Sequence, residues 1–315
     1  MIEVRQLQEQ RLGGVPGESY ESLRPYLFAV AYRMTGAASD AEDLVHDAWI
    51  RYLDAGSPAV ASLKAYLTTI VSRLTLDYLK SARVTRETYV GTWLPEPVMT
   101  HEAIPGPEHA AEQHEAVSIA FLALLERLTP DQRVVFVLRS GFGLPFTEIG
   151  DHLGRSSAAC RQLFQRAERV IAAMPEHVSP RPEGPAVAEE IVSRFLAALE
   201  QGDLTAVKAL LSDQAIWLGD GGEHHRAIRR TVRGADKVAR GILGYQRKNP
   251  NENTGYTIED LNGGPAVIEW DGDEIVRVSF PAFDGDRIAG LRGIVNPDKL
   301  RHLKQAGLRP PSASS

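Results

Sequence analysis

The chain has 315 residues and a formal net charge of −6, with 43% hydrophobic and 24% charged residues. This length exceeds one typical core, so two or three domains are expected. The single cysteine, Cys160, excludes an internal disulfide and a multi-cysteine metal site. With no signal-like apolar start and no run of membrane-spanning length, the composition predicts a soluble cytoplasmic protein.

The first module is predicted to be helical. Apolar residues recur at helical spacing over 23–34 and the stripe ends near Gly36, a residue typical of a helix C-terminus. Ser39, followed three residues later by Glu42, resembles a capping box that opens a second helix. A third helix is predicted over about 63–79, with basic residues following its end.

Two proline-rich stretches divide the chain. Residues 93–108 hold four prolines and one glycine, and residues 175–186 hold four prolines. Such segments cannot continue a helix and behave as extended spacers. We therefore expect three modules separated by two linkers.

The middle module carries a helix-turn-helix pattern. Thr129-Pro130-Asp131-Gln132 has the form of a capping box with proline in the first turn, and it opens a helix that runs to Gly141. A short helix over 146–153 follows, then a turn at Gly154, and then a helix capped by Ser156 or Ser157. A short helix, a glycine turn and a second helix are the arrangement that reads the DNA major groove.

The second helix of this pair carries the candidate DNA contacts. Arginine and glutamine make paired hydrogen bonds to base edges, whereas flanking arginines suit phosphates. An ordinary charged surface helix would show the same pattern, so this alternative stays open on the pattern alone. The residues predicted to contact DNA here are Arg155, Ser157, Arg161, Gln162, Gln165 and Arg166.

The last module is predicted to be α+β. A helix that ends at Gly202 and a second helix over 204–211 precede stretches of alternating hydrophobicity. Asp-Gly pairs at 271–272 and 284–285 are plausible hairpin turns between strands. Helices followed by an antiparallel sheet are typical of the α+β class.

Three segments of the first half carry a family resemblance. "SDAEDLVHDAWIRYL" and "AYLTTIVSRLTLDYLKSARVTRE" resemble region 2 of bacterial sigma factors, and "LERLTPDQRVVFVLRSGFGLPFTEIGDHLG" resembles region 4. Together they cover roughly 18–175 in the expected order, without a region 3 between them. The chain is similar in this respect to the extracytoplasmic-function sigma factors. The resemblance implies promoter DNA and core RNA polymerase, through its beta-prime clamp and beta flap, as partners.

The resemblance also implies roles for single residues in region 2. Four acids would dock on the clamp of polymerase, although acids in a first helical turn also complement the helix dipole. Four further residues would contact and open the −10 element, and Arg73 stands where the family usually has asparagine. The polymerase-docking set is Asp40, Glu42, Asp43 and Asp47. The −10 set is Arg73, Asp77, Lys80 and Arg83.

The extension beyond region 4 resembles a SnoaL-like domain, a curved antiparallel sheet closed by helices into a cone. The stretches that carry this are "VSRFLAALEQGDLTAVKALLSDQAIWLGDGG", "VRGADKVARGIL" and "GIVNPDKLRHL". With "TWLPEP" in the first linker, they are similar to a subgroup in which a sigma factor and a SnoaL-like domain are fused. The "DGGEHHR" stretch departs from the subgroup pattern at Glu223 and His224.

These observations give a domain layout and a set of candidate regulatory contacts. The predicted units are a region 2 domain (1–88), a linker (89–116), a region 4 domain (117–178), a linker (179–186), a SnoaL-like domain (187–305) and a disordered tail (306–315). The fused domain is expected to control the factor by contacting the other two, and Lys299, Leu300 and Leu303 are expected to hold that compact state together. The candidate contacts are Trp93, Leu94, Pro95, Asp220, Gly221, Gly222, Asn296, Pro297, Asp298 and Lys299.

Several interpretations remain open from the sequence. No separate anti-sigma factor, metal or cofactor is expected, and the cone is a possible site for a small ligand. One alternative is a stand-alone helix-turn-helix regulator with a ligand-binding domain. Another is an enzyme with a DNA-tethering module, in which Trp217, Asp220, His224, His225 and Trp270 would line a pocket. The basic run 226–248, eight cations against one acid, would pair with the acidic first half, touch upstream DNA or form a solvated face.

Overall fold

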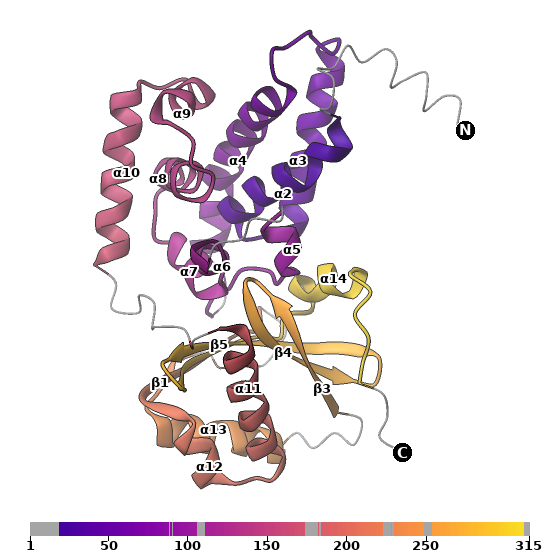
Figure 1. Ribbon diagram of the computed structural model, residues 1–315, viewed down its shortest axis with the longest axis vertical. Helices are drawn as coiled ribbons and strands as arrows, with labels where there is room; N and C mark the ends of the chain where they lie inside the picture. Colours follow the sequence, from indigo (N-terminus) through magenta and orange to yellow (C-terminus); the bar gives the residue numbers. More distant parts are fainter. Residues whose placement is uncertain are drawn as a thin grey trace.

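The structure is a computed structural model and describes residues 19–87, 89, 91–105, 111–173, 182, 184–222, 228, 230–248 and 254–311. A helical part, built from the first half of the chain, rests on a second part in which a sheet carries helices (Figure 1). The segment that joins the two modules of the helical part lies where the helical part meets the sheet (Figure 1).

Three helices form the first module, as predicted, but two of their boundaries differ. They are α2 (Tyr20–Thr35), α3 (Ala38–Asp54) and α4 (Leu63–Glu87). Helix α4 runs well past residue 79, so the basic residues expected to follow it lie on the helix itself. The capping box at Ser39 is wrong, because α3 starts at Ala38 without a cap from its own chain segment. The acceptor is instead a carboxylate from the linker, described below.

The linker and the middle module contain short helices and the predicted helix-turn-helix. Thr129 and Gln132 form the expected capping box, and Ser156 caps the second helix of the pair. Gly154 ends the first helix of the pair in the left-handed conformation, with φ 64°. The elements are α5 (Thr100–Ala103), α6 (Ala111–Ala116), α7 (Ile119–Leu125), α8 (Pro130–Phe136), the π-helical η1 (Val137–Gly141), α9 (Phe146–Leu153) and α10 (Ser157–Ala172).

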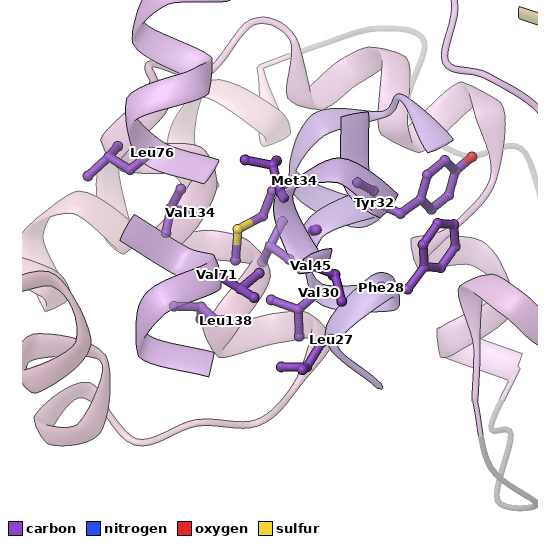
Figure 2. Close-up of a cluster of buried hydrophobic side chains, with 14 of the residues drawn as sticks. Leu27, Phe28, Val30, Tyr32, Met34, Val45, Val71, Leu76, Val134 and Leu138 are labelled. Atoms are coloured by element: carbon purple, nitrogen blue, oxygen red, sulfur yellow. The ribbon is translucent and has the colours of Figure 1, made fainter. Parts of the chain in front are cut away.

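The first two modules share one hydrophobic core. Val71 and Leu76 of α4 belong to the same buried cluster as Val134 of α8 and Leu138 of η1, with Met34 of α2 in their midst (Figure 2). Burial of this apolar surface is the main force that holds the two modules together.

The last module is α+β, as predicted, with one difference in its sheet. Strands β1 and β6 pair in parallel, whereas all other neighbours are antiparallel, so the sheet is mixed. The strand order is β2-β1-β6-β5-β4-β3. The elements are α11 (Pro185–Glu200), α12 (Leu204–Ala209), β1 (Leu211–Asp220), β2 (Val232–Arg233), α13 (Ala235–Lys248), β3 (Thr254–Leu261), β4 (Gly264–Asp271), β5 (Glu274–Asp284), β6 (Arg287–Ile294) and α14 (Pro297–Gln305).

Tight turns join the last four strands. The two Asp-Gly hairpins are confirmed, and Gly272 and Gly285 have φ of 58° and 59°. A third turn, Asn262-Gly263, joins β3 to β4 with φ of 50° and 81°. Positive φ at both central residues is typical of the type I′ hairpin that Asn-Gly favours.

The two faces of the sheet have different partners. Helices α11, α12 and α13 contribute to a core on one face. The opposite face packs on α14 and on apolar residues from outside the module, Leu94 of the linker and Ile119 of α7. This third core therefore spans the junction of the modules.

Candidate polymerase and promoter surfaces and the domain junction

The acids expected to dock on polymerase lie on α3 and differ in their surroundings. Asp43 and Asp47 are exposed and one helical turn apart. Asp40 accepts a hydrogen bond of 2.5 Å from the hydroxyl of Tyr78, and Glu42 lies 3.5 Å from the guanidinium of Arg24. Asp43 and Asp47 are thus the acids of the set most open to a partner.

The residues expected to read the −10 element lie along α4. Asp77 and Lys80 are exposed. Arg73 donates hydrogen bonds to the backbone carbonyls of His152, at 2.7 Å, and Asp151, at 3.3 Å, in helix α9. The side chain of Arg83 lies outside the described residues. One member of the predicted −10 set therefore binds the helix-turn-helix module.

Next to Arg73, a buried histidine reinforces the same contact. The Thr69 hydroxyl lies 2.6 Å from Nδ1 of His152. Burial lowers the pKa of His152, which favours the neutral ring at this interface. Helix α9 is thus fixed on α4 by both side-chain and backbone partners.

The recognition helix α10 points its candidate contacts outward. Arg161, Gln162, Gln165 and Arg166 are exposed, and Ser157 is half-buried. Arg155 forms an ion pair of 2.5 Å with Asp131 of α8. Most of the predicted −35 surface is therefore accessible while the modules are packed together.

The predicted contacts of the fused domain converge on one buried ion pair. Asp220, at the end of β1, is fully buried and lies 2.6 Å from the ammonium of Lys299 on α14. Asp220 also accepts hydrogen bonds from the backbone N–H of Leu94, at 2.7 Å, and from the Tyr89 hydroxyl, at 2.5 Å. Lys299 donates to the carbonyl of Leu94. The ion pair thus binds both the backbone N–H and the backbone carbonyl of Leu94.

Around this pair the linker contacts the first module. The ammonium of Lys299 lies 4.2 Å from the centre of the Trp93 ring, a cation–π contact. On its other side Trp93, with Pro95, packs against Gly36 so closely that a Cβ there would lie 2.9 Å from Trp93. The linker is therefore more than the extended spacer that its prolines predict, because residues such as Leu94 and Val98 are buried in the junction.

The remaining members of the predicted junction set lie beside the same pair. Asn296 donates 3.0 Å to the Tyr89 hydroxyl and caps α14, whose first residue is Pro297. A Cβ at Gly222 would lie 2.8 Å from the Asn296 amide, and Gly221 is buried. Asp298 is the exception, because it is exposed and pairs with Arg301 on the same helix.

Glu96 supplies the cap of the helix that carries the polymerase-docking acids. Its carboxylate accepts hydrogen bonds from the backbone N–H groups of Ala38, at 2.8 Å, and Ser39, at 3.2 Å. These are orphan donors of the first turn of α3, and a carboxylate there also complements the helix dipole. Burial raises the pKa of Glu96, and the two backbone hydrogen bonds oppose this shift.

Asn262, in the hairpin turn between β3 and β4, joins all three modules. Its amide donates 2.6 Å to the Tyr32 hydroxyl and 3.0 Å to the carbonyl of Val117, and its carbonyl oxygen accepts 3.0 Å from the N–H of Val98. A Cβ at the neighbouring Gly263 would lie 2.2 Å from the carbonyl oxygen of His114, so only glycine fits there.

Two buried arginines bind the helical modules through backbone carbonyls. Arg33 donates to the carbonyls of Ala103, at 3.0 and 3.2 Å, and Gly141, at 3.1 Å. Burial lowers the pKa of Arg33 to about 10, so its guanidinium stays charged at neutral pH. Arg133 of α8 donates 3.2 Å to the carbonyl of Met34.

A histidine and a glutamate form a further contact between α14 and the linker. Nε2 of His302 lies 3.1 Å from both carboxylate oxygens of Glu102, and its ring stacks on Phe28 of α2 at 6.0 Å. The hydrogen bond to Glu102 raises the pKa of His302. Burial alone would raise the pKa of Glu102, but His302 holds it below its usual value.

The constellation considered for an enzyme is not assembled by the described residues. Trp217 packs against Gly241 in the core beneath α13, whereas Trp270 is buried in the core of the opposite face. Asp220 is occupied by Lys299. His224 and His225 lie outside the described residues, as do Glu223 and most of the proline-rich stretch 175–186.

Sequence reasoning missed several junction residues. Of these, Asn262 carried the signal of its Asn-Gly hairpin turn, and Glu96 lies in the "TWLPEP" stretch, although nothing there indicated a helix cap. Tyr32, Arg33 and Arg133 act on groups far along the chain, which no periodicity reveals.

Comparison with known proteins decides the family. Residues 19–85 match the model of Sigma-70 region 2, and residues 118–171 match that of Sigma-70, region 4. The chain is 43% identical to the ECF RNA polymerase sigma factor SigJ of Mycobacterium tuberculosis over 89% of this chain and 92% of that protein. This chain belongs to the extracytoplasmic-function sigma factors. A probable sigma factor of this family, SigI of the same species, is 30% identical over 91% of this chain and 95% of that protein.

A solved structure supports the three-module arrangement of this sigma factor. The crystal structure of M. tuberculosis SigJ superposes with a TM-score of 0.70 and 36% identity, covering 90% of this chain and 97% of that one. The role of this sigma factor is promoter-specific initiation of transcription, with core RNA polymerase and promoter DNA as partners; a stand-alone regulator is not favoured.

The described residues contain neither a membrane-spanning helix nor a metal-binding cluster. None of the described helices has the length and apolar character to span a membrane. Across the same ranges, His, Cys, Asp and Glu nowhere gather into a group of three able to hold a metal ion.

Proposed function

We propose that the C-terminal SnoaL-like domain is a built-in brake that holds this sigma factor in a compact state. It would act in the cytoplasm, in place of a separate anti-sigma factor. In the active state, Asp43 and Asp47 would dock on the beta-prime clamp, α4 would reach the −10 element, and α10 would read the −35 element beside the beta flap. Catalysis has no part in this proposal.

The contact between α4 and α9 carries the proposal. Arg73 of the −10 set lies 2.7 Å from a carbonyl of the helix-turn-helix module. The two promoter elements lie about 25 base pairs apart by their names, which is roughly 85 Å of B-form DNA. Helix α10 has 16 residues and is only about 24 Å long, so it cannot bridge this distance while its module is in contact with α4. The two modules must therefore separate before both promoter elements are bound.

The C-terminal domain opposes this separation through the linker. Asp220 and Lys299 form hydrogen bonds with the backbone of Leu94. Asn262 forms hydrogen bonds with Tyr32 of the first module and with Val117 at the start of the second. These contacts are buried, so each leaves unsatisfied polar groups if only one partner moves. Release of the domain therefore removes one of the two restraints on separation, the other being the apolar core that the two DNA-reading modules share.

The separation can be measured with two labels. Ser81 on α4 and Glu168 on α10 are exposed, and the only cysteine, Cys160, is buried. We expect Ser81→Cys/Glu168→Cys protein, labelled for energy transfer, to report a short distance when free and a much longer one with core polymerase and promoter DNA. An unchanged distance in an initiating complex contradicts the proposal. The unmodified chain, labelled in parallel, corrects for reaction at Cys160.

A further inference from the structure

The outer face of helix α13 concentrates positive charge in a protein that is negative overall. Four exposed cations of the helix lie within one sector, at positions 237, 240, 247 and 248. Asp236 flanks them and is already paired with Arg240, at 2.8 Å, and Lys208, at 3.4 Å. We call this set the basic face: Lys237, Arg240, Arg247 and Lys248.

The basic face is not the side by which α13 packs in the domain. Ala235, Val238, Ala239 and Leu243 are buried and turn toward the sheet, where the helix contacts β1, β2 and α12. Figure 1 shows α13 on the side of the sheet away from the helical modules. The described acids of the first half therefore do not neutralise this face, which leaves it available to an outside polyanion.

A glycine in the middle of the basic face is not explained by packing. Gly244 lies on α13 between Arg240 and Arg247, and a Cβ there would meet no atom within 4 Å. Glycine inside a helix costs roughly 0.5–1 kcal/mol relative to alanine. By contrast, a Cβ at Gly241 would lie 2.9 Å from Trp217, so that glycine has an internal reason. Because Gly244 has no side chain, the backbone of a partner can approach the helix closely between the cations of the basic face.

We infer that the basic face binds the phosphate backbone of duplex DNA upstream of the −35 element. From Lys237 to Lys248 the face extends over about 17 Å, at 1.5 Å per residue, which matches a few phosphates of one strand. Arginine and lysine heads on an exposed helix suit phosphates without reading bases. The contact is sequence-independent.

The upstream direction follows from the order of the modules. DNA downstream of the −35 element must lead to the −10 element, where α4 and core polymerase act. The C-terminal domain follows α10 directly in the chain, so the free duplex within its reach is on the other side. Such a contact would anchor the domain on DNA after it has left the linker. The inference rests on the promoter role of the chain and not on the brake.

The test uses full-length protein with core polymerase and a promoter on which it initiates. Two DNA fragments are compared, one ending just upstream of the −35 element and one extended there by about two helical turns of arbitrary sequence. We expect the longer fragment to bind more tightly, and Lys237→Glu/Arg247→Glu to lower its affinity roughly tenfold. The slope of log affinity against log salt should fall by about 2, at about 0.9 per phosphate contact.

A matched double reversal separates this contact from general electrostatics. Arg194→Glu/Arg309→Glu removes two exposed cations elsewhere in the C-terminal part of the chain, and it should leave affinity and salt slope as in the wild type. The inference is overturned if the wild type binds both fragments equally, or if both double variants behave alike. It is also overturned if the α13 variant weakens binding to core polymerase without DNA. If no promoter supports initiation, the sigma function itself fails instead.

Discussion

The side-chain amide of Asn262 in the C-terminal domain donates a hydrogen bond of 2.6 Å to the hydroxyl of Tyr32, which lies 230 positions earlier in the first module. The same amide holds Val117 at the start of the second module. One turn residue thus touches both DNA-reading modules, and its loss should loosen the compact state more than its small size suggests.

Replacement of Asn262 by glycine should isolate the effect of its side chain, because glycine keeps the positive φ of the turn. The buried N–H of Val98 and carbonyl of Val117 then lose this partner, at a cost of about 1–3 kcal/mol, whereas the Tyr32 hydroxyl keeps its hydrogen bond to the carbonyl of Glu96. We expect a lower free energy of unfolding and faster proteolysis in the first linker. Asp273→Gly, at the exposed turn between β4 and β5, is the control; equal effects of the two variants would count against the role of Asn262.

When the linker leaves, Ser39 should replace Glu96 as the residue that caps α3. Glu96→Ala removes the acceptor of the Ala38 and Ser39 N–H groups, but Ser39 and Glu42 still have the spacing of a capping box. We expect the single variants Glu96→Ala and Ser39→Ala to cost at most about 1 kcal/mol each, and the double variant to cost more than their sum. Amide hydrogen exchange in the first turn of α3 measures this; strict additivity would exclude the second cap.

The His302–Glu102 contact should make docking of α14 depend on pH. The pKa of His302 is raised in the folded protein, so its contribution is complete below about 6.5 and is lost as pH rises through the raised value. Glu102 of α5, Glu42 of α3 and Glu96 of the linker all favour the charged ring. We expect the difference in melting temperature between wild type and His302→Gln to shrink from pH 6 to pH 9. A constant difference would show that the ring acts only by packing.

Arg161 should contribute to promoter choice through the −35 element. It is exposed on the first turns of α10, where a paired contact to guanine discriminates by about 1–3 kcal/mol. Arg161→Ala should therefore reduce transcription roughly 5- to 150-fold and relax the preference at one base pair. Glu168→Ala on the same helix serves as the control, and loss of activity without any change in base preference would point to a phosphate contact instead.

Much of this architecture could be predicted because it is local. The helix-turn-helix, with Gly154 and the cap at Ser156, and the two Asp-Gly hairpins follow from short-range turn and cap chemistry. The Asp220–Lys299 region was predicted from motif resemblance, although Asp298 turned out to face solvent. The helix start at Ala38 was mispredicted because its cap comes from Glu96, and Arg73 was assigned to DNA alone because its carbonyl partners lie in another module. Such long-range polar contacts leave no periodic trace in a sequence.

Transcription in vitro with core RNA polymerase tests the brake most directly. Full-length protein should be compared on a promoter library with Lys299→Met, which leaves Asp220 buried without its partner, and with a chain cut at about residue 180. Breaking one side of a buried ion pair costs about 3–5 kcal/mol, so the junction should open although the C-terminal domain remains part of the chain. The account predicts that all three initiate at the same promoters and that both altered forms are more active. Lower activity of both forms, or no initiation by any of them, would contradict it.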